Sequence, residues 1–377
     1  MAYSSPLLYS RGPGAISYRR RDLIGGVVTY EVDIFKSPLR RNPGTMAVDN
    51  HHRIWRDGKF VDWEDATIHV MSHVVHYGSS VFEGIRCYET PNGPAVFRLG
   101  SHMRRFADSC RIYRMPLKYS IEEMSKAAVE TVAENELPHC YLRPVAIRTG
   151  EQMGVLPSDT PLEVFIIPWT WGTYLGADAL KNGADVCVSS WRRPAPDTIP
   201  MMAKAGGNYL NGQLSKMQAR VDNYVEGIML DAFGLVSEGS GENLFLVRDG
   251  KLFTSTISAG ILNGITRDSV IRIARDMGLE VVEQSIPREM LYIADELFFT
   301  GTAAEITPIR SVDRIPIGAA KPGEITLRIQ REYMGIAGGT LEDRYGWLTP
   351  VPVRKTVSAA RGKPSREPVG DMSASAI

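Results

Sequence analysis

Hydrophobic and polar residues alternate along the chain with two spacings, one typical of helices and one typical of strands. Apolar positions three and four residues apart predict helices at residues 101–113 and 121–135. Ser120 is a suitable N-cap for the second helix, and Pro138 lies where that helix must have ended, because proline cannot continue a helix.

Strand-like runs surround these two helices. Residues 59–63 follow the turn dipeptide Asp57-Gly58 and predict one arm of a hairpin, and residues 95–98 predict another strand. We therefore expect a small α+β domain over residues 46–175.

Strands dominate the second half of the chain. A polar stretch bounded by glycines, residues 176–183, predicts an interdomain linker, and residues 184–350 are expected to form a larger domain. Its predicted strands cover residues 186–190, 227–231, 235–238, 243–248 and 251–254, and its predicted helices cover residues 208–223, 267–277 and 287–293.

The two ends of the chain show no sustained period. Residues 1–45 and 351–377 are rich in proline and basic residues, and we expect both to be disordered. Residues 1–21 contain arginine and serine but no acidic residue, which is typical of organelle transit peptides. A plain extension, or a start codon upstream of the true one at Met46, is the alternative interpretation.

The composition is that of a folded protein with two domains. The 377 residues are 44% hydrophobic and 23% charged, which provides enough apolar side chains for a sizeable core. Lys and Arg together number 43, as do Asp and Glu, so the chain has no overall basic field that would hold a nucleic acid. Both ends are basic, so the part between them is mildly acidic, and it must bind anionic ligands with local groups.

Cysteine usage and hydropathy indicate the compartment. Four cysteines lie far apart without Cys-x-x-Cys spacing, which fits a reducing environment. No apolar run approaches the roughly 18 residues of a membrane helix, and the run at residues 164–167 ends at Pro168. We expect a cytoplasmic protein, or an organellar one if residues 1–21 act as a transit peptide.

The histidines all lie in the first part of the chain, at or before His139. His69, His73 and His76 have a spacing that would place them on one helical face, as in some zinc sites. No carboxylate completes a His-Glu-x-x-His pattern, and the valines between them favour a strand. We therefore predict structural histidines and no metal, and any acid or base in the second half must be Lys, Glu, Asp or Tyr.

The segment around Lys204 carries the first indication of chemistry. Its neighbours over residues 199–210 are small and mostly apolar, which weakens solvation of the ammonium ion and lowers the pKa of the amine. A neutral lysine amine is a nucleophile that forms Schiff bases. An exposed lysine beside a glycine turn is the alternative, and the segment alone does not separate the two.

A second segment places two carboxylates in a glycine-rich turn. Glu238 and Glu242 are separated by Gly239 and Gly241, which let a backbone approach a ligand closely. A carboxylate held in this turn can hydrogen-bond a protonated ring nitrogen, whereas an ordinary acidic turn is the alternative.

Two further turns offer hydrogen-bond donors. Residues 260–266 lead into the helix predicted at 267–277, whose start presents unpaired N–H groups and the hydroxyl of Thr266 to an anion. The turn at residues 301–305 follows an apolar strand and has almost no side-chain bulk. A lysine for a Schiff base, a helix start for a phosphate and a carboxylate for a pyridinium together predict pyridoxal 5′-phosphate (PLP) as cofactor.

At these positions the chain resembles the branched-chain amino acid aminotransferases, which are class IV aminotransferases of PLP fold type IV. The resemblance extends from about Ile54 to Leu348. It implies an α+β fold of two domains, with a smaller α/β N-terminal domain and a larger, β-barrel-like C-terminal domain with helices, and it implies a homo-oligomer. The stretches that carry it are residues 68–73, 76–78, 81–86, 199–210, 237–245, 264–268 and 301–308.

The resemblance also assigns cofactor-binding roles. It implies that Lys204 carries PLP and moves the proton between Cα and C4′, that Glu238 pairs with the pyridine nitrogen, and that Tyr209 bonds the phenolic oxygen. Arg105 would hold the phosphate with help from the start of the helix and from Thr302. The full implied set is Arg105, Lys204, Tyr209, Glu238, Gly264, Ile265, Thr266, Gly301 and Thr302.

Substrate contacts follow from the same resemblance. Thr302 and Ala303 would bind the α-carboxylate, and Arg143 would bind the distal carboxylate of glutamate. In the family the region of Tyr77 and Val155 reaches across a dimer interface. The full implied set of substrate-binding residues is Tyr77, Phe82, Arg86, Tyr141, Arg143, Val155, Trp171, Thr302 and Ala303, with Tyr209 also lining the pocket.

We therefore predict PLP-dependent exchange of the amino group between L-leucine, L-isoleucine or L-valine and 2-oxoglutarate, as the last step of branched-chain amino acid biosynthesis or the first step of degradation. The alternatives are a D-amino acid or amine transaminase, an aminodeoxychorismate lyase of the same fold, and a non-catalytic metabolite-binding protein. The Phe-Glu-Gly-Ile-Arg pattern at residues 82–86 favours the branched-chain enzymes, and Lys204 and Glu238 argue against a non-catalytic protein.

Overall fold

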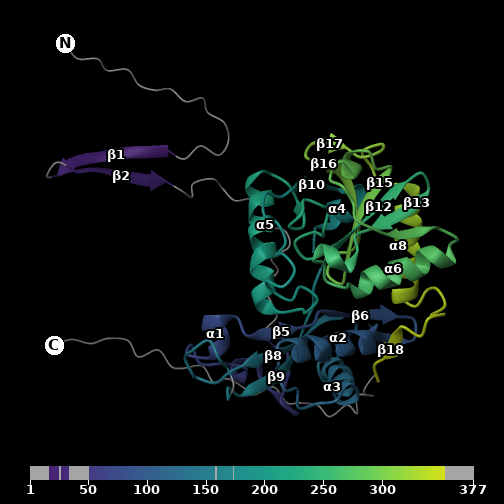
Figure 1. Cartoon of the computed structure of the whole chain (residues 1–377). Coiled ribbons are helices and arrows are strands. Elements are labelled where there is room, and N and C mark those ends of the chain that lie inside the picture. Colours follow the sequence, from purple (N-terminus) through teal and green to yellow (C-terminus); the bar gives the residue numbers. More distant parts are fainter. Residues whose placement is uncertain (1–16, 25–26, 34–50, 158, 173, 353–377) are drawn as a thin grey trace, which may run out of the picture.

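The computed structural model describes residues 17–24, 27–33, 51–157, 159–172 and 174–352. Its main body contains two eight-stranded sheets, and Figure 1 shows one above the other with helices packed around them. The mixture of helices and sheets confirms the predicted α+β class.

The first sheet is antiparallel throughout. Its strands are β3 (Ile54–Arg56), β4 (Lys59–Val61), β5 (Ser80–Phe82), β6 (Ile85–Thr90), β7 (Gly93–Phe97), β8 (Cys140–Arg148), β9 (Leu162–Trp169) and β18 (Leu348–Pro350). The strand order is β18-β7-β6-β8-β9-β3-β4, and β5 pairs with β8. The hairpin arm predicted at residues 59–63 and the strand predicted at 95–98 are confirmed as β4 and β7.

Two helices pack on this sheet, α2 (Leu99–Ile112) and α3 (Ile121–Glu134), and both confirm the predicted helices to within two residues. Ser120 caps α3 as expected. Its hydroxyl accepts a hydrogen bond from the Glu123 amide at 3.1 Å, and the Glu123 carboxylate accepts one from the Ser120 amide at 2.8 Å. The apolar faces of both helices bury Phe106 and Met124 against the sheet.

The second sheet mixes parallel and antiparallel pairs. Its strands are β10 (Ala184–Val188), β11 (Glu226–Ile228), β12 (Asn243–Arg248), β13 (Lys251–Thr254), β14 (Val281–Glu283), β15 (Glu296–Gly301), β16 (Glu305–Val312) and β17 (Ile315–Pro316). The strand order is β11-β10-β16-β15-β12-β13-β14, and β17 pairs with β16.

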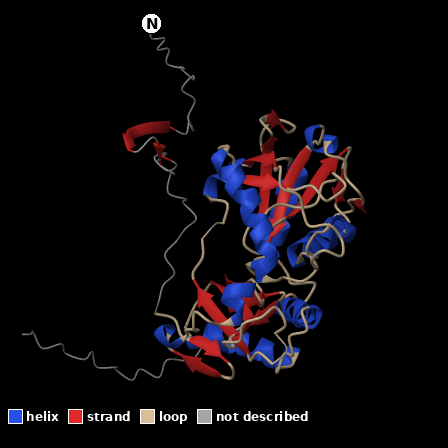
Figure 2. Cartoon of the chain, turned by 60° about the vertical axis from the view of Figure 1, so that its left-hand side comes forward, coloured by secondary structure: helices blue, strands red, loops and turns tan. Residues whose placement is uncertain are grey.

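Both faces of the second sheet are buried, because helices lie on either side (Figure 2). Along β12, Leu244 and Leu246 point to one apolar cluster, while Phe245 points to the other and stacks on Phe298 with ring centroids 5.2 Å apart. The helices of this half are α4 (Ala177–Asn182), α5 (Tyr209–Val221), α6 (Ile265–Asp276), α7 (Glu289–Tyr292) and α8 (Glu324–Ala337), and they include the three predicted ones.

Two local predictions were wrong. Residues 235–238 form only isolated bridges, because their amides bond to Ile286 and Met229 outside any continuous ladder. The valine-rich segment around the histidines is not a strand, because His73–Tyr77 forms the short helix α1, which ends at Gly78 with φ of +64°.

The chain ends and the expected linker also differ from prediction. Strands β1 (Ser17–Ile24) and β2 (Val27–Asp33) form an antiparallel hairpin within the extension expected to be disordered, because β2 is rich in β-branched residues. Residues 176–183 contain α4, which packs against β16 and is part of the second half instead of a free linker. The body continues one residue into the predicted tail, since the buried Val351 donates its amide to Pro94. Apart from Pro352, the other residues of both predicted extensions lie outside the described ranges.

Two further features concern the length of the helices and the cysteines. Within the described residues no helix is long and apolar enough to cross a membrane. All four cysteines are buried free thiols.

Candidate active site

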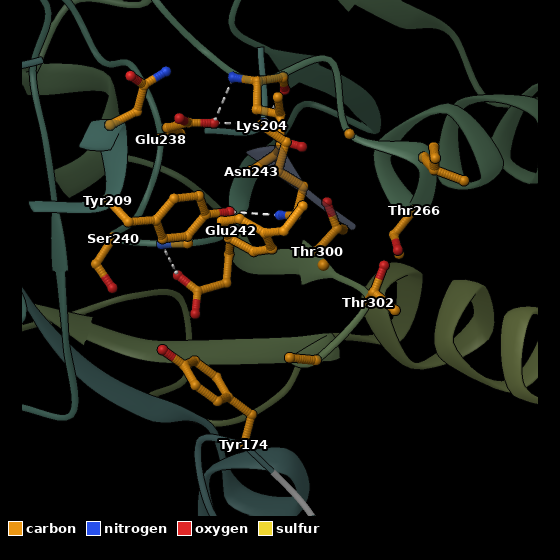
Figure 3. A pocket seen from close by; sticks show the side chains of 18 of the residues that line it. Tyr174, Lys204, Tyr209, Glu238, Ser240, Glu242, Asn243, Thr266, Thr300 and Thr302 are labelled. Atoms are coloured by element: carbon orange, nitrogen blue, oxygen red, sulfur yellow. Dashed lines mark hydrogen bonds between the residues drawn. The ribbon is translucent and has the colours of Figure 1, made fainter. Parts of the chain in front are cut away.

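A cavity of about 360 Å³ lies where loops and strands of both sheets converge. The first half of the chain contributes residues of β5, α2 and β8 to its wall. The second half contributes the Lys204 segment, α5, the turn at 238–243, the start of α6 and the turn at 300–303 (Figure 3). Every predicted site residue lines this central cavity except Tyr77, Arg86 and Val155.

The backbone of Lys204 is held by the first half of the chain. Its carbonyl accepts a hydrogen bond from the Phe82 amide at 2.9 Å, and its amide donates to the hydroxyl of Ser109 at 3.0 Å. Val81 and Ala205 add an isolated antiparallel bridge. These contacts fix where the side chain of Lys204 enters the central cavity.

The amine of Lys204 is buried and partly desolvated. It donates to the hydroxyl of Tyr209 at 2.5 Å (Figure 3) and lies 5.0 Å from the ring centroids of Phe82 and Tyr209. Burial, together with the positive charge of Arg105, lowers the pKa of Lys204 to about 8. The exposed-lysine alternative does not fit this position, whereas a nucleophilic amine does.

Tyr209, the first residue of α5, keeps its proton. Burial raises the pKa of its hydroxyl well above the usual value. The hydroxyl therefore accepts a hydrogen bond from Lys204 and retains its own proton to donate to an oxygen atom of a ligand. The ring packs against Phe82 with centroids 4.9 Å apart, which orients the hydroxyl.

Glu238 lies in the turn before β12 and is almost completely buried. One carboxylate oxygen pairs with Arg193 at 2.7 Å, and the other accepts hydrogen bonds from Asn243 at 2.9 Å and from the Leu262 amide at 3.1 Å. Burial raises the pKa of Glu238, and Arg193 offsets part of that rise. Three of about four acceptor positions are used, which leaves one for an N–H group of a ligand.

The start of α6 and Arg105 form an anion-binding corner. Gly264 is the N-cap of α6, and the amides of the first helical turn, including Ile265 and Thr266, have no partner within the helix. Arg105 reaches this corner from α2 and donates to the carbonyl of Asn263 at 2.9 Å. Helix start and guanidinium thus line the same end of the central cavity.

Arg86 supports the turn between β15 and β16 on the side that faces away from the cavity. Its Nε donates to the carbonyl of Thr302 at 2.7 Å, and its Nη2 donates to the carbonyl of Ala303 at 2.8 Å. A trans peptide places N–H opposite C=O, so the amide of Ala303 points away from Arg86. Arg86 was predicted to contact substrate, but it does not line the cavity and instead orients the residues that do.

Aromatic side chains form another wall of the cavity, with one cation among them. Phe82, Tyr141 and Trp171 line it, and the ring centroids of Tyr141 and Trp171 are 4.5 Å apart. The guanidinium of Arg143 lies 4.6 Å from the Phe82 centroid, and its buried Nε has no hydrogen-bond partner within the described part of the chain. This wall suits an apolar side chain and still offers a charge to a carboxylate.

Tyr77 and Val155 lie outside the cavity on the surface. Tyr77 is 41% exposed and Val155 is 85% exposed. The hydroxyl of Tyr77 accepts a hydrogen bond from the Gly154 amide at 3.1 Å, so the two residues belong to one surface feature. A single copy of the chain does not bring them into the site.

Several cavity residues were missed by the sequence reasoning. Asn243 lies in the segment 237–245 that the sequence analysis singled out. Its side-chain amide can both donate and accept hydrogen bonds, and this property could have indicated a role in the cavity. Arg193 and Tyr174 belong to no motif, and only the fold brings them to the cavity. Glu242 was noted as an acid, and burial close to Glu226 raises its pKa.

The polar groups that line the cavity match the polar groups of PLP. Besides the free Nε of Arg143, the hydroxyl of Thr300 and one carboxylate oxygen of Glu242 are buried without a hydrogen-bond partner in the described residues, and both residues line the cavity. Unpaired buried polar atoms are costly unless a ligand or water satisfies them. An anion corner, a buried carboxylate and a low-pKa amine are thus arranged around one space.

The histidine cluster has an ordinary structural environment. The ring nitrogens of His73 contact the hydroxyl of Ser79 at 2.7 Å and the carbonyl of Gly154 at 3.0 Å. Among the described residues no group of three or more His, Cys, Asp or Glu side chains is arranged to hold a metal ion.

Comparisons with known proteins agree with this geometry. The family model for class IV aminotransferases matches residues 80–312. The branched-chain-amino-acid aminotransferase of Salmonella typhimurium is 52% identical over 299 residues, covering 79% of this chain and 97% of the relative.

Two solved structures are similar in the same way. The crystal structure of the Escherichia coli branched-chain amino acid aminotransferase superposes with a TM-score of 0.78 at 51% identity, covering 80% of this chain and all of that one. The T.th. branched-chain amino acid aminotransferase, solved with N-(5′-phosphopyridoxyl)-L-glutamate, has a TM-score of 0.75 at 44% identity, covering 80% of this chain and 99% of that one.

Proposed function

The chain belongs to the class IV aminotransferases, among the branched-chain-amino-acid aminotransferases, and from this premise we propose that it exchanges the amino group between L-leucine, L-isoleucine or L-valine and 2-oxoglutarate with PLP as cofactor. The observation that carries the proposal is the buried amine of Lys204. It shares one cavity with the carboxylate of Glu238 and the anion corner at the start of α6.

PLP, when bound, supplies an aldehyde carbon for amines and an electron-withdrawing ring that acidifies the substrate Cα–H. The residues of this chain hold it at three places. Arg105 and the amides of Ile265 and Thr266 bind the phosphate, Glu238 holds the ring nitrogen in its protonated form, and Tyr209 donates to the phenolic oxygen. A carboxylate beside the ring nitrogen favours its charged form, which is the form that withdraws electrons best.

Lys204 is the acid and base of the reaction. Its amine would carry the cofactor, and the same amine would move the proton between Cα of the substrate and C4′. A pKa of about 8 leaves roughly a tenth of the amine neutral at pH 7, so both protonation states are available.

Substrates are held by the turn and by the aromatic wall. The amides of the Thr302–Ala303 turn receive the α-carboxylate, and Phe82, Tyr141 and Trp171 surround the aliphatic side chain. Leu, Ile and Val differ by a methyl branch or a methylene, which apolar pockets discriminate by only about 1–3 kcal/mol, so all three are substrates.

Glutamate uses the same cavity in the second half-reaction. Its distal carboxylate needs a cation where an aliphatic side chain otherwise sits. Arg143 lies among the aromatic rings, and its Nε has no hydrogen-bond partner among the described residues. The T.th. relative was solved with a phosphopyridoxyl-L-glutamate adduct, which supports glutamate as a substrate of this protein. The proposed role of the reaction is the last step of branched-chain amino acid biosynthesis or the first step of degradation.

We further propose that the chain forms a homo-oligomer. Large apolar side chains are exposed on α1, on the residues just before it and on the loop between β8 and β9, namely Ile68, Val70, Met71, Val75, Tyr77, Met153, Val155 and Leu156. Exposed apolar surface of this kind marks interfaces. The native mass of the Val155→Asp variant tests the idea, because a charge in a buried interface should dissociate the oligomer, and an unchanged mass would contradict this surface as the interface.

A substrate panel tests the activity. With 2-oxoglutarate as acceptor, L-leucine, L-isoleucine and L-valine are expected to react. Activity confined to D-alanine or to aminodeoxychorismate would overturn the proposal. Borohydride reduction of the holoenzyme should fix the cofactor on Lys204, as peptide mass spectrometry would reveal, and Lys204→Ala should abolish turnover while the near-UV circular dichroism of the protein is retained.

A further inference from the structure

Glu83 is a completely buried carboxylate that the mechanism above does not use. It lies between β5 and β6, and its amide donates to the carbonyl of Pro144 at 2.8 Å, which anchors the backbone. A buried charge is costly unless it is paired and hydrogen-bonded. The contacts of this side chain therefore indicate what it does.

Four donors surround the carboxylate of Glu83. Oε1 accepts from Nε of Arg105 at 2.6 Å, and Oε2 accepts from Nη2 of the same residue at 2.9 Å. Oε2 also contacts Nδ1 of His102 at 2.7 Å and the amide of Gly84 at 3.2 Å. Although burial alone would raise the pKa of Glu83, Arg105 and His102 hold it well below its usual value, so the carboxylate is ionised.

An ionised carboxylate accepts hydrogen bonds and donates none, which settles the state of His102. Its Nδ1 must carry the proton, and burial lowers the pKa of the ring, so His102 is a neutral donor to Glu83. His102 and the Gly84 amide hold the carboxylate from one side, and the guanidinium of Arg105 occupies the other.

The donors of Arg105 can be counted. A guanidinium has five N–H groups. Two point to Glu83, and one on Nη1 points to the carbonyl of Asn263, which directly precedes the N-cap of α6. Two N–H groups remain, on a side chain that lines the cavity beside Gly264, Ile265 and Thr266.

We propose that Glu83, supported by His102, is a positioning residue that fixes the guanidinium of Arg105 for the cofactor phosphate and thereby makes the protein select the phosphorylated cofactor over pyridoxal. The inference rests on the proposed function, because it assigns the anion corner to the phosphate of PLP. Glu83 itself touches no ligand and acts only through Arg105.

The bidentate pair explains why a carboxylate is required. A glutamine at this position presents one oxygen and one NH₂ group, and the NH₂ group faces donors of Arg105 or His102. The guanidinium then loses a fixed contact, and its remaining N–H groups no longer point together with the amides of α6. The cost falls on ligands that carry a phosphate, because pyridoxal places nothing in the anion corner.

The experiment compares two ligands that differ only in the phosphate. Apoprotein is titrated with PLP and with pyridoxal at one pH, and the dissociation constants are taken from the absorbance of the bound chromophore. For Glu83→Gln we expect the ratio of the pyridoxal constant to the PLP constant to fall at least about tenfold, the effect of one lost charge-assisted hydrogen bond. The pyridoxal constant should change less than about twofold.

A double-mutant cycle separates action through Arg105 from a general structural effect. Arg105→Ala alone should lower the ratio, and adding Glu83→Gln to it should lower the ratio no further, because the residue that Glu83 positions is gone. Glu226→Gln is the matched control, since Glu226 is equally buried and pairs with Lys216 at 2.6 Å but does not contact Arg105. It should leave the ratio unchanged even if it lowers the melting temperature.

The outcomes are distinguishable. A wild-type ratio in Glu83→Gln, an equal loss of affinity for both ligands, or additive effects in the cycle would each overturn the inference. If Glu83→Gln fails to fold, Glu83→Asp and His102→Gln provide the comparison. Each should lower the ratio, though by less than Glu83→Gln. An unchanged ratio in both variants would count against the inference. Wild-type protein that captures neither ligand would instead overturn the proposed function.

Discussion

Replacing Arg86 with lysine tests whether Arg86 fixes the conformation of the turn between β15 and β16. The wild-type guanidinium holds two carbonyls, those of Thr302 and Ala303, at 2.7 and 2.8 Å, and lies 3.8 Å from Glu305. An ammonium group keeps the charge but not the planar fork. Lysine can therefore hold one of the two carbonyls, and the other loses its partner.

The size of the effect follows from these contacts. A hydrogen bond to a charged donor contributes about 1.5–3 kcal/mol, and about 1.4 kcal/mol corresponds to a factor of ten. Losing one such bond in Arg86→Lys should therefore weaken binding at the turn by about tenfold or more. Amino acid and 2-oxo acid substrates share the α-carboxylate, so both KM values should rise by the same factor. PLP affinity should fall by a smaller factor, because Thr302 is only one of the groups expected to hold the phosphate.

The assay is a steady-state measurement of KM for L-leucine and for 2-oxoglutarate, together with a titration of the apoprotein with PLP. Arg98→Lys serves as the control. Arg98 is also a buried arginine of the first half that reaches α6, at Ser269 and Asp268, but it does not line the cavity. Unchanged KM values in Arg86→Lys, or a rise for only one of the two substrates, would show that Arg86 does not fix the carboxylate-binding turn.

Two further predictions concern the cavity. Gly84→Ala should raise the KM of branched-chain substrates, because an added Cβ would lie 1.7 Å from the hydroxyl oxygen of Tyr141. In the control Gly100→Ala, in α2, the added Cβ meets nothing within 4 Å, so KM should be unchanged. Equal KM values in the two variants would contradict the packing argument. The rate at which apoprotein captures PLP should increase with pH through about 8, since the neutral amine of Lys204 is the nucleophile and burial lowers its pKa. Stopped-flow absorbance between pH 6 and about 10 measures this rate, and a continued rise toward the ordinary lysine pKa would count against a desolvated amine.

Local patterns predicted much of the fold. Helices α2, α3, α5 and α6 begin and end within two residues of the predicted limits, because apolar spacing and caps such as Ser120 are encoded by neighbouring residues. Strand order and the return of β18 to the first sheet were not predictable in this way, because pairing joins residues far apart in the chain. Leu348 pairs with Phe97, about 250 positions away.

The candidate site, like the fold, was predictable from the sequence only in part. The chemical groups could be identified from local segments, because Lys204, Glu238 and the start of α6 stand in segments whose composition implies an amine, a carboxylate and an anion site. The pKa values of these groups and the contacts that hold them depend on the packing of distant elements. Arg193 meets Glu238, and Glu83 meets Arg105, through contacts between different elements.

Arg86 shows most clearly what could not be predicted from the sequence. From sequence it was expected to bind substrate, but its guanidinium lies behind the turn and bonds to carbonyls more than 200 residues away. A residue type states which bonds a side chain can make. Which partner it meets depends on how the two halves of the chain pack, and burial then sets the pKa of a group such as Lys204, so both were decided by the tertiary structure.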